Sequence, residues 1–204
     1  MIAIVDYGVG NLFSLASSFA AIGAPVVVTG DAKVLRDAER IVLPGVGAFG
    51  DAADKLRATG LDRAVIAEAE AGKPLLGICL GMQLLFDKSY EYGEHAGLGL
   101  IPGAVRPISE VIPADYKIPH IGWNALIYKR PTPLFKYIRE GDCVYFVHSF
   151  AAMDCEENVI ATAEYGPELT AAVQRQNVFG CQFHPEKSGK VGLNILKAFC
   201  EVAP

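Results

Sequence analysis

Four short, almost uniformly apolar runs in the first half of the chain constrain the fold more than any other feature. They are segments 2–5 (IAIV), 25–28 (PVVV), 40–45 (RIVLPG) and 74–78 (PLLGI), and helical stretches separate them. A strand that is apolar throughout must be covered on both faces, which is typical of parallel sheets. Because strands and helices alternate, we predict a doubly wound α/β fold with a mostly parallel sheet and helices on both faces.

The second half, after about residue 88, is richer in strands. Gly, Pro and Asn turns join the runs VRPIS (105–109), HIGWNALIY (120–128), DCVYFVHSF (142–150), NVIATAEY (158–165), LTAAVQRQ (169–176) and VFGCQF (178–183). A closing helix over about 191–202 places Val191, Ile195 and Phe199 on one face. We see no internal repeat and no linker. We therefore predict a single domain, residues 1–204, with strand-rich insertions in its second half.

Composition argues against several classes of protein. The 18 Lys and Arg are scattered and outnumbered by 23 Asp and Glu, which disfavours a nucleic-acid partner. Five widely spaced cysteines without a CxxC pair fit a reducing cytoplasm and predict neither a disulfide framework nor a zinc site. The start MIAIVDYG lacks a basic n-region and is interpreted as a first strand rather than a signal peptide. No apolar run approaches the roughly 18 residues of a membrane span, so we expect a cytoplasmic protein without membrane contact.

A cysteine stands where the strand 74–78 meets the next helix. Gly77 lies two residues before Cys79, and Gly81 lies two residues after it. A sharp strand-to-helix turn strains its hinge residue, and small neighbours let the backbones pass. This is the cysteine version of the G-x-S-x-G nucleophile elbow, and the following helix N-terminus favours a thiolate. The alternative is a buried cysteine beside chance glycines in a chain that has 21 of them.

A base for this nucleophile is found in the segment CQFHPEKSG, 181–189. His184 follows a strand, Glu186 comes two residues later, and Pro185 disfavours a helical His184. We expect the segment to be extended, so that both side chains address one site. Cys79, His184 and Glu186 are therefore a candidate triad, the alternative being a strand-end histidine bonded to backbone.

Acyl transfer also needs hydrogen-bond donors for an oxyanion. One is expected at the backbone N–H of Leu80, which follows the nucleophile. A second is expected from the loop 44–50, PGVGAFG, where Gly45 and Gly47 let an N–H turn inward. As a phosphate cradle this loop lacks the Lys and Ser/Thr of a P-loop, and DYGVGNL has Phe13 where a dinucleotide fingerprint needs glycine.

These motifs resemble a known family. GICLGMQ (77–83) with FHPE (183–186) resembles the triad class of glutamine amidotransferases, whose members also feed ammonia to GMP, anthranilate or carbamoyl phosphate synthesis. DYGVGNL, LPGVGAFG, GMQLLF, PHIGWNAL, YFVHSF and QFHPEKSG resemble the glutaminase subunits of imidazole glycerol phosphate synthases. The resemblance runs from residue 5 to 190, and PHIGWN and PGVGAFG discriminate best. It implies the class I glutamine amidotransferase fold.

The resemblance implies a role for each matching residue. Cys79 is the nucleophile, His184 the general acid/base and Glu186 its orienter. The oxyanion would be bound by backbone N–H groups of Val46, Gly47 and Leu80. Glutamine would be held by Gly47, Gln83, Glu91, Ser149 and Phe150. A carboxylate at Glu91 suits the substrate's α-ammonium group.

Other residues are assigned to the partner side or to structure. Asn11, Trp123 and Lys187 are implied to face a partner subunit, although Trp123 could equally be a core aromatic. His120 and His148 are interpreted as structural, because neither has a carboxylate at a suitable spacing.

The implied reaction is glutamine hydrolysis through a glutamyl thioester, with no metal or organic cofactor. The implied partner is a (β/α)₈ cyclase in a heterodimer. It would use the ammonia on a phosphoribosyl-formimino-type ribonucleotide, giving imidazole glycerol phosphate and an aminoimidazole carboxamide ribotide for histidine biosynthesis. Three alternatives stay open: a glutaminase serving another synthase, a non-catalytic subunit with a vestigial site, and a cysteine hydrolase of the same fold acting on other acyl compounds.

Overall fold

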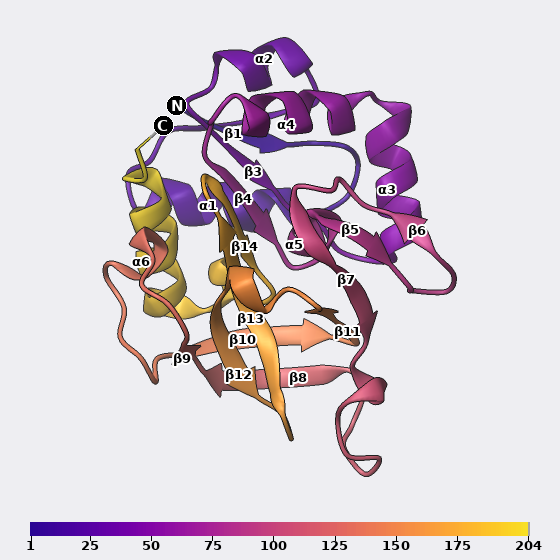
Figure 1. The fold of residues 1–204 in the computed structure, drawn as a ribbon. Coiled ribbons are helices and arrows are strands. Elements are labelled where there is room, and N and C mark those ends of the chain that lie inside the picture. Colours follow the sequence, from indigo (N-terminus) through magenta and orange to yellow (C-terminus); the bar gives the residue numbers. More distant parts are fainter. Residues whose placement is uncertain (204) are drawn as a thin grey trace.

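An eight-stranded sheet organises the protein, which we analysed as a computed structural model describing residues 1–203. Five of its strands are mutually parallel, in the order β2 (Val26–Thr29), β1 (Ile2–Val5), β3 (Arg40–Leu43), β4 (Leu75–Ile78) and β14 (Val178–Cys181). Three antiparallel strands extend it: β13 (Glu168–Arg175), β12 (Val159–Glu164) and β9 (Ile127–Tyr128). The mostly parallel sheet predicted from the apolar runs is confirmed (Figure 1).

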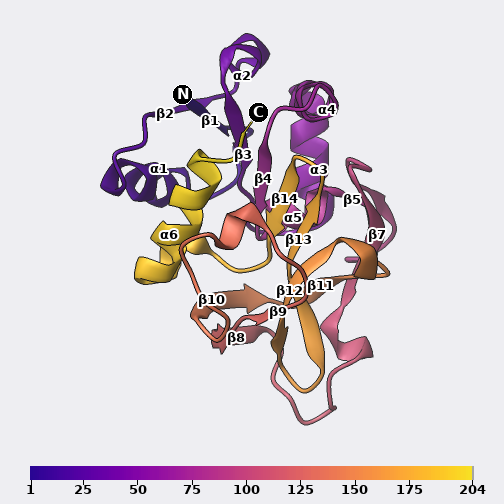
Figure 2. The same ribbon diagram turned by 60° about the vertical axis from the view of Figure 1, so that its left-hand side comes forward.

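Helices cover both faces of the parallel part (Figure 2). On one face lie α1 (Leu12–Ala21) and α6 (Gly189–Cys200). On the other lie α2 (Ala32–Asp37), α3 (Phe49–Ala58), α4 (Leu61–Glu70) and α5 (Leu80–Leu84). Alternate residues of β1 serve the two faces: Ile2 and Ile4 join one core cluster, whereas Ala3 and Val5 join the other. This is why the run is apolar throughout.

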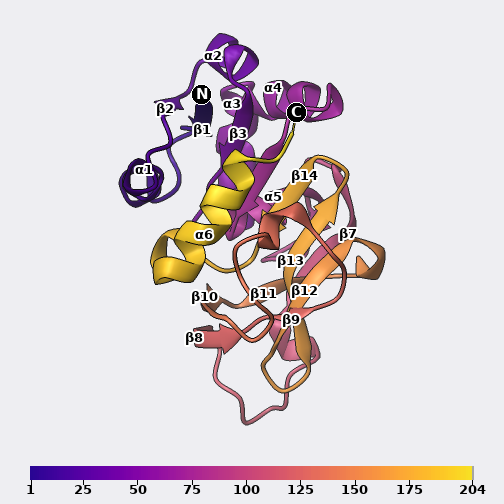
Figure 3. The ribbon, with the colours of Figure 1, turned by 90° about the vertical axis from the view of Figure 1, so that its left-hand side faces the viewer.

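The strand-rich second half builds two smaller sheets. One pairs β8 (His120–Ala125) with β10 (Cys143–His148). The other is ordered β11 (Phe150–Met153), β7 (Ile101–Pro107), β5 (Phe86–Ser89) and β6 (His95–Ala96). Short 3₁₀ turns occupy Ile108–Glu110, Pro133–Phe135, Glu156–Asn158 and Pro185–Lys187. The β8–β10 sheet lies at the opposite end of the molecule from α2 (Figure 3).

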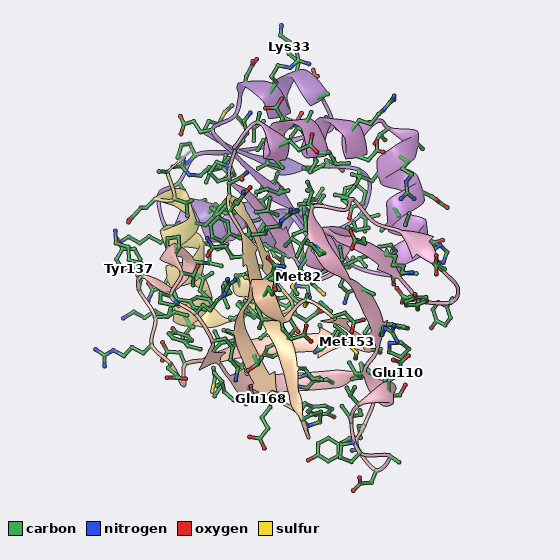
Figure 4. The ribbon with its side chains drawn as sticks, viewed as in Figure 1. Lys33, Met82, Glu110, Tyr137, Met153 and Glu168 are labelled. Carbon is green, nitrogen blue, oxygen red and sulfur yellow. The ribbon has the colours of Figure 1, made fainter. Side chains whose placement is uncertain are left out.

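Two expectations about local structure were wrong. The run MQLLF, 82–86, predicts the helix after the elbow, but that helix is α5, Leu80–Leu84, and Phe86 already begins β5. The run 105–109 is strand only to Pro107, after which a 3₁₀ turn begins. In both places tertiary pairing decides the boundary: Phe86 pairs with Ile101, and Ile108 donates its N–H to Ser149. Met82 of α5 lies in the interior, where its side chain packs against Gly180 of β14 (Figure 4).

Candidate active site

Cys79 occupies the hinge between β4 and α5, in a backbone conformation that L-residues rarely adopt. Its φ is +53° and its ψ −112°, and its N–H donates to the Cys181 carbonyl at 2.7 Å. A Cβ on Gly81 would lie 1.9 Å from the Leu43 carbonyl oxygen, and one on Gly77 would lie 2.7 Å from the Gly81 oxygen. The hinge is therefore strained, and both glycines are required by close backbone approach, as the elbow motif predicts.

His184 and Glu186 form a tight buried pair. The His184 Nδ1 lies 2.7 Å from Glu186 Oε1, and each side chain is 4% exposed. The expectation of an extended segment here was wrong beyond His184: Pro185–Lys187 is a 3₁₀ turn, and Ser188 Oγ donates to the His184 carbonyl to close it. The turn, rather than strand geometry, brings residues i and i+2 to one site.

The proton affinity of His184 reflects its two neighbours. Burial lowers the pKa of the imidazole, but hydrogen bonds to Cys79 and Glu186 and the negative charge on both outweigh it and raise the pKa to about 9. The structure thus favours an imidazolium held between the Cys79 sulfur and the Glu186 carboxylate. A cysteine beside such a cation is suited to act as a nucleophile.

A second side chain, which the sequence analysis did not single out, contacts the nucleophile. Gln182 is fully buried, and its Nε2 lies 3.8 Å from Cys79 Sγ. Its Oε1 accepts a hydrogen bond from Gln83 Nε2 at 2.9 Å. The amide orientation is therefore fixed with its donor toward the sulfur. In the sequence, its position two residues before His184 in QFHPE could have indicated that Gln182 faces the same site.

A cleft of about 340 Å³ opens over Cys79 and His184. It lies beyond the carboxyl end of β4, where open α/β sheets bind ligands. Every residue expected to bind the oxyanion or glutamine lines it: Val46, Gly47, Leu80, Gln83, Glu91, Ser149 and Phe150. Five separate stretches of sequence thus meet at one cavity, as the resemblance implies.

The loop before α3 borders this cleft and is anchored mainly at its ends. The buried Tyr7 Oη donates to the Pro44 carbonyl at 2.8 Å, a contact that the sequence analysis did not anticipate. Gly47 has a φ of +91°, which suits glycine, and Val46 is 43% exposed. Leu80 is the first residue of α5, so its N–H has no acceptor within the helix. Two backbone segments with candidate oxyanion donors therefore border the nucleophile.

Glu91 ties the far end of this loop to the cleft. Its Oε2 accepts the Phe49 N–H at 2.7 Å, at the start of α3. Burial raises the pKa of this carboxyl group, while the Phe49 N–H and the nearby His95 work in the opposite direction. A partly buried carboxylate that lines the cleft is suited to an ammonium group.

Comparison with known proteins decides the family. The sequence matches the class-I glutamine amidotransferase family over residues 3–202. It is 49% identical over 204 residues to the imidazole glycerol phosphate synthase subunit HisH of Wolinella succinogenes, covering 99% of this chain and 100% of the relative. The HisH subunit of Aquifex aeolicus is 48% identical over 198 residues, covering 96% and 94%. This chain belongs to the HisH family of class I glutamine amidotransferases.

Solved structures agree on the fold of this HisH-family chain. A crystal structure of a glutamine amidotransferase superposes with a TM-score of 0.76 at 18% identity, covering 98% of this chain and all of the other. PurLQS from Thermotoga maritima superposes with a TM-score of 0.75 at 24% identity, covering 98% and 96%. The predicted class I glutamine amidotransferase fold is confirmed.

The three residues expected to face a partner lie around the site of this HisH-family chain. Trp123 is 55% exposed, so the core interpretation is wrong; its ring meets that of Tyr145 edge-on at 5.9 Å. Lys187 lines the cleft, with its Nζ 5.9 Å from the Tyr145 ring. Asn11 caps α1 through Ser14 and lines a small cavity behind His184 and Glu186. None of these contacts identifies a partner.

Within residues 1–203, no group of three or more His, Cys, Asp or Glu side chains could hold a metal ion. In the same described range, every helix is too short or too polar to cross a bilayer.

Proposed function

We propose that this chain is the glutaminase subunit of an imidazole glycerol phosphate synthase, and that residues 1–204 form one glutaminase domain. The observation that carries the proposal is the Cys79–His184–Glu186 constellation at a strained hinge in a cleft with a half-buried carboxylate. The HisH relatives are subunits of imidazole glycerol phosphate synthase, which supports this choice of synthase. We propose a cytoplasmic enzyme that needs no metal or organic cofactor.

The first half-reaction releases ammonia. The Cys79 thiolate attacks the side-chain carbonyl carbon of L-glutamine, and the oxyanion receives backbone N–H bonds from Leu80 and from Val46 or Gly47. The imidazolium of His184 gives its proton to the departing nitrogen as the carbon–nitrogen bond breaks, which leaves a glutamyl thioester and ammonia. Glu186 holds the His184 ring by its Nδ1 throughout.

The second half-reaction restores the enzyme. His184, now neutral, accepts a proton from water as the water attacks the thioester, and the carbon–sulfur bond breaks to give glutamate. Glu91 holds the substrate's α-ammonium group, with Gln83 and the backbone of Ser149 and Phe150 holding the rest. This division gives every residue predicted to bind glutamine a place in the cleft.

The ammonia must reach a second site before solvent takes it. We propose that a (β/α)₈ cyclase subunit covers the mouth of the cleft, against Asn11, Trp123 and Lys187, and consumes the ammonia to make imidazole glycerol phosphate and aminoimidazole carboxamide ribotide. Exposed apolar side chains, including Ile121 at 57% exposure beside Trp123, suit such a contact. No nucleic acid or membrane takes part.

Cys79→Ala in the complex with the cyclase tests the proposal. Glutamine-dependent synthesis should be abolished, while synthesis from added ammonium salt should continue at the wild-type rate, because the cyclase is untouched. Loss of both activities would refute channelled ammonia. The chain alone should turn over glutamine slowly until the cyclase and its ligand bind; high activity of the lone subunit would contradict this.

The same preparation separates the open alternatives. Co-purification with a different synthase would identify another ammonia user. A wild-type chain that neither hydrolyses glutamine in the complex nor is labelled at Cys79 by a diazo-ketone glutamine analogue would have a vestigial site. Turnover of other acyl compounds without such labelling would indicate a different cysteine hydrolase.

A further inference from the structure

Two buried histidines form one hydrogen-bonded pair at the wall of the cleft. His148 ends β10 and lines the cleft; His120 begins β8 directly opposite it. They are 6% and 1% exposed, and His120 Nδ1 lies 3.0 Å from His148 Nε2. The catalytic steps above use neither of them.

The pair bridges two acceptors that cannot donate. His148 Nδ1 lies 2.8 Å from the Phe150 carbonyl oxygen. His120 Nε2 lies 2.7 Å from Asn124 Oδ1, and the orientation of this amide is fixed because its Nδ2 donates to the Glu164 carbonyl at 2.9 Å. Both outer ring nitrogens must therefore carry protons.

The pair lacks one ring proton if both imidazoles are neutral. Two neutral imidazoles carry two ring protons, yet three contacts of 2.7, 3.0 and 2.8 Å need one each. In any neutral arrangement, one contact would set two lone pairs against each other at hydrogen-bond distance. All three bonds form only if the pair holds a third proton, and hence one positive charge.

Some neighbours of the pair stabilise this positive charge and others destabilise it. The His120 ring lies between two aromatic faces, with ring centroids at 4.0 Å to Tyr165 and 5.1 Å to Phe146, which favours a cation. Burial lowers the pKa of both imidazoles. For His148, burial and the positive charges of His120 and His184 together outweigh the bond to the Phe150 carbonyl and lower the pKa to about 4. The cost of burying this positive charge is therefore offset by completing all three hydrogen bonds.

The chain continues from the pair to the nucleophile. The Phe150 carbonyl that accepts from His148 also accepts from Gln83 Nε2 at 3.1 Å. Gln83 bonds to Gln182, whose amide nitrogen faces Cys79 Sγ. Asn124, at the other end, is next to the exposed Trp123 on β8.

We propose that the His120–His148 pair carries one shared extra proton and is a positioning element that fixes the Ser149–Phe150 backbone for glutamine. This inference rests on the proposed glutaminase function for its kinetic consequence, but the proton count does not depend on it. The pair touches no reacting atom in this proposal and acts through the Phe150 carbonyl.

The proton count is tested by nitrogen NMR of the wild-type full chain with ¹⁵N-labelled histidine at pH 7. Spectra of His120→Gln and His148→Gln assign the signals. Three of the four ring nitrogens of the pair should be protonated; two would overturn the shared proton. In Asn124→Ala one acceptor is gone, so two protons satisfy two contacts and the count should fall to two. A count of three in that variant would contradict the argument.

Positioning is tested by kinetics of the complex with the cyclase. His120→Gln, which lies outside the cleft lining, should raise the KM for glutamine about tenfold, the equivalent of one lost hydrogen bond, and change kcat less. Tyr165→Phe is the matched control: it keeps the ring against His120, loses only the bond to the Lys117 carbonyl, and should leave KM unchanged.

Each outcome bears on one claim. An unchanged KM in folded His120→Gln would refute positioning, and an equal rise in Tyr165→Phe would show mere packing damage. If His120→Gln melts early, the wild-type proton count still tests the charge. A wild-type complex that does not hydrolyse glutamine would refute the proposed function and leave the proton count standing.

Discussion

The elbow, residues 77–81, and the oxyanion loop, residues 44–48, border the same cleft but are held in different ways. All five elbow residues are buried, and backbone atoms crowd both glycines. In the loop, Pro44 and Gly45 are buried, whereas Val46 and Gly47 are exposed and a Cβ on Gly47 would meet nothing within 4 Å. The core therefore fixes Cys79, the proposed nucleophile, while the proposed oxyanion donors of the loop lie in a segment anchored mainly at its ends.

The loop, rather than the elbow, is the part of the cleft wall that can rearrange. Moving Cys79 would mean moving β4 and α5 through a close-packed core, which is costly. Turning a peptide between Gly45 and Phe49 breaks no core contact, because the Tyr7 and Glu91 anchors lie on either side of it. The proposed partner subunit can thus complete the proposed oxyanion donors without disturbing Cys79, His184 and Glu186.

The largest effect expected from this comparison is on folding. Gly81→Ala places a Cβ 1.9 Å from the Leu43 carbonyl oxygen, and two backbones must separate. We expect it to cost about 3 kcal/mol or more and to leave much of the chain unfolded. Urea unfolding followed by circular dichroism measures this.

Gly47→Ala is the matched control for the loop. It meets no atom, but its φ of +91° strains an L-residue by about 1–2 kcal/mol. The loop can relax, so the unfolding midpoint should stay near that of the wild type, while kcat in the complex falls about tenfold. Equal destabilisation by the two variants would remove the distinction between elbow and loop.

The pH dependence of activity tests the buried His184–Glu186 pair beside the elbow. Since the His184 pKa is raised to about 9, the imidazolium is present at neutral pH and is lost as pH rises through that value. The kcat/KM of the complex should therefore fall above about pH 9. Glu186→Gln removes a charge that raises this pKa, so the alkaline limb should move to lower pH.

Glu110→Gln is the control for that profile, because Glu110 is exposed at the surface and does not line the cleft (Figure 4). Its alkaline limb should coincide with that of the wild type. An unmoved limb in Glu186→Gln would mean that Glu186 does not stabilise the imidazolium.

Much of this arrangement could be predicted from sequence because it is encoded locally. The apolar runs specify a parallel sheet, and Gly-x-Cys-x-Gly specifies the hinge at Cys79. His184 and Glu186 lie two residues apart, so their pairing is a local property even though a 3₁₀ turn, rather than a strand, produces it. The expected cleft residues rest on family resemblance, and they do line one cavity.

The contacts that were missed depend on tertiary structure. Tyr7 reaches Pro44 across 37 residues, and Gln182 reaches Gln83 across 99. His120 and His148 meet only because β8 and β10 pair in one register. Nothing in the local sequence of either partner indicates the other, so these contacts can be identified only once the fold is known.

The smallest expected effect concerns the anchor of the loop. Tyr7→Phe removes the hydroxyl that bonds the buried Pro44 carbonyl and leaves that acceptor unpaired, which should cost about 1–2 kcal/mol of stability. If the anchor also holds the oxyanion loop, kcat in the complex should fall a few-fold while KM is unchanged. Tyr128→Phe is the matched control, since its buried hydroxyl has no hydrogen-bond partner among the described residues, and it should lower neither stability nor kcat. A Tyr7→Phe enzyme that loses stability but keeps full kcat would show that the loop holds its donors without this anchor, and the contrast between a fixed elbow and an end-anchored loop would then rest on Glu91 alone.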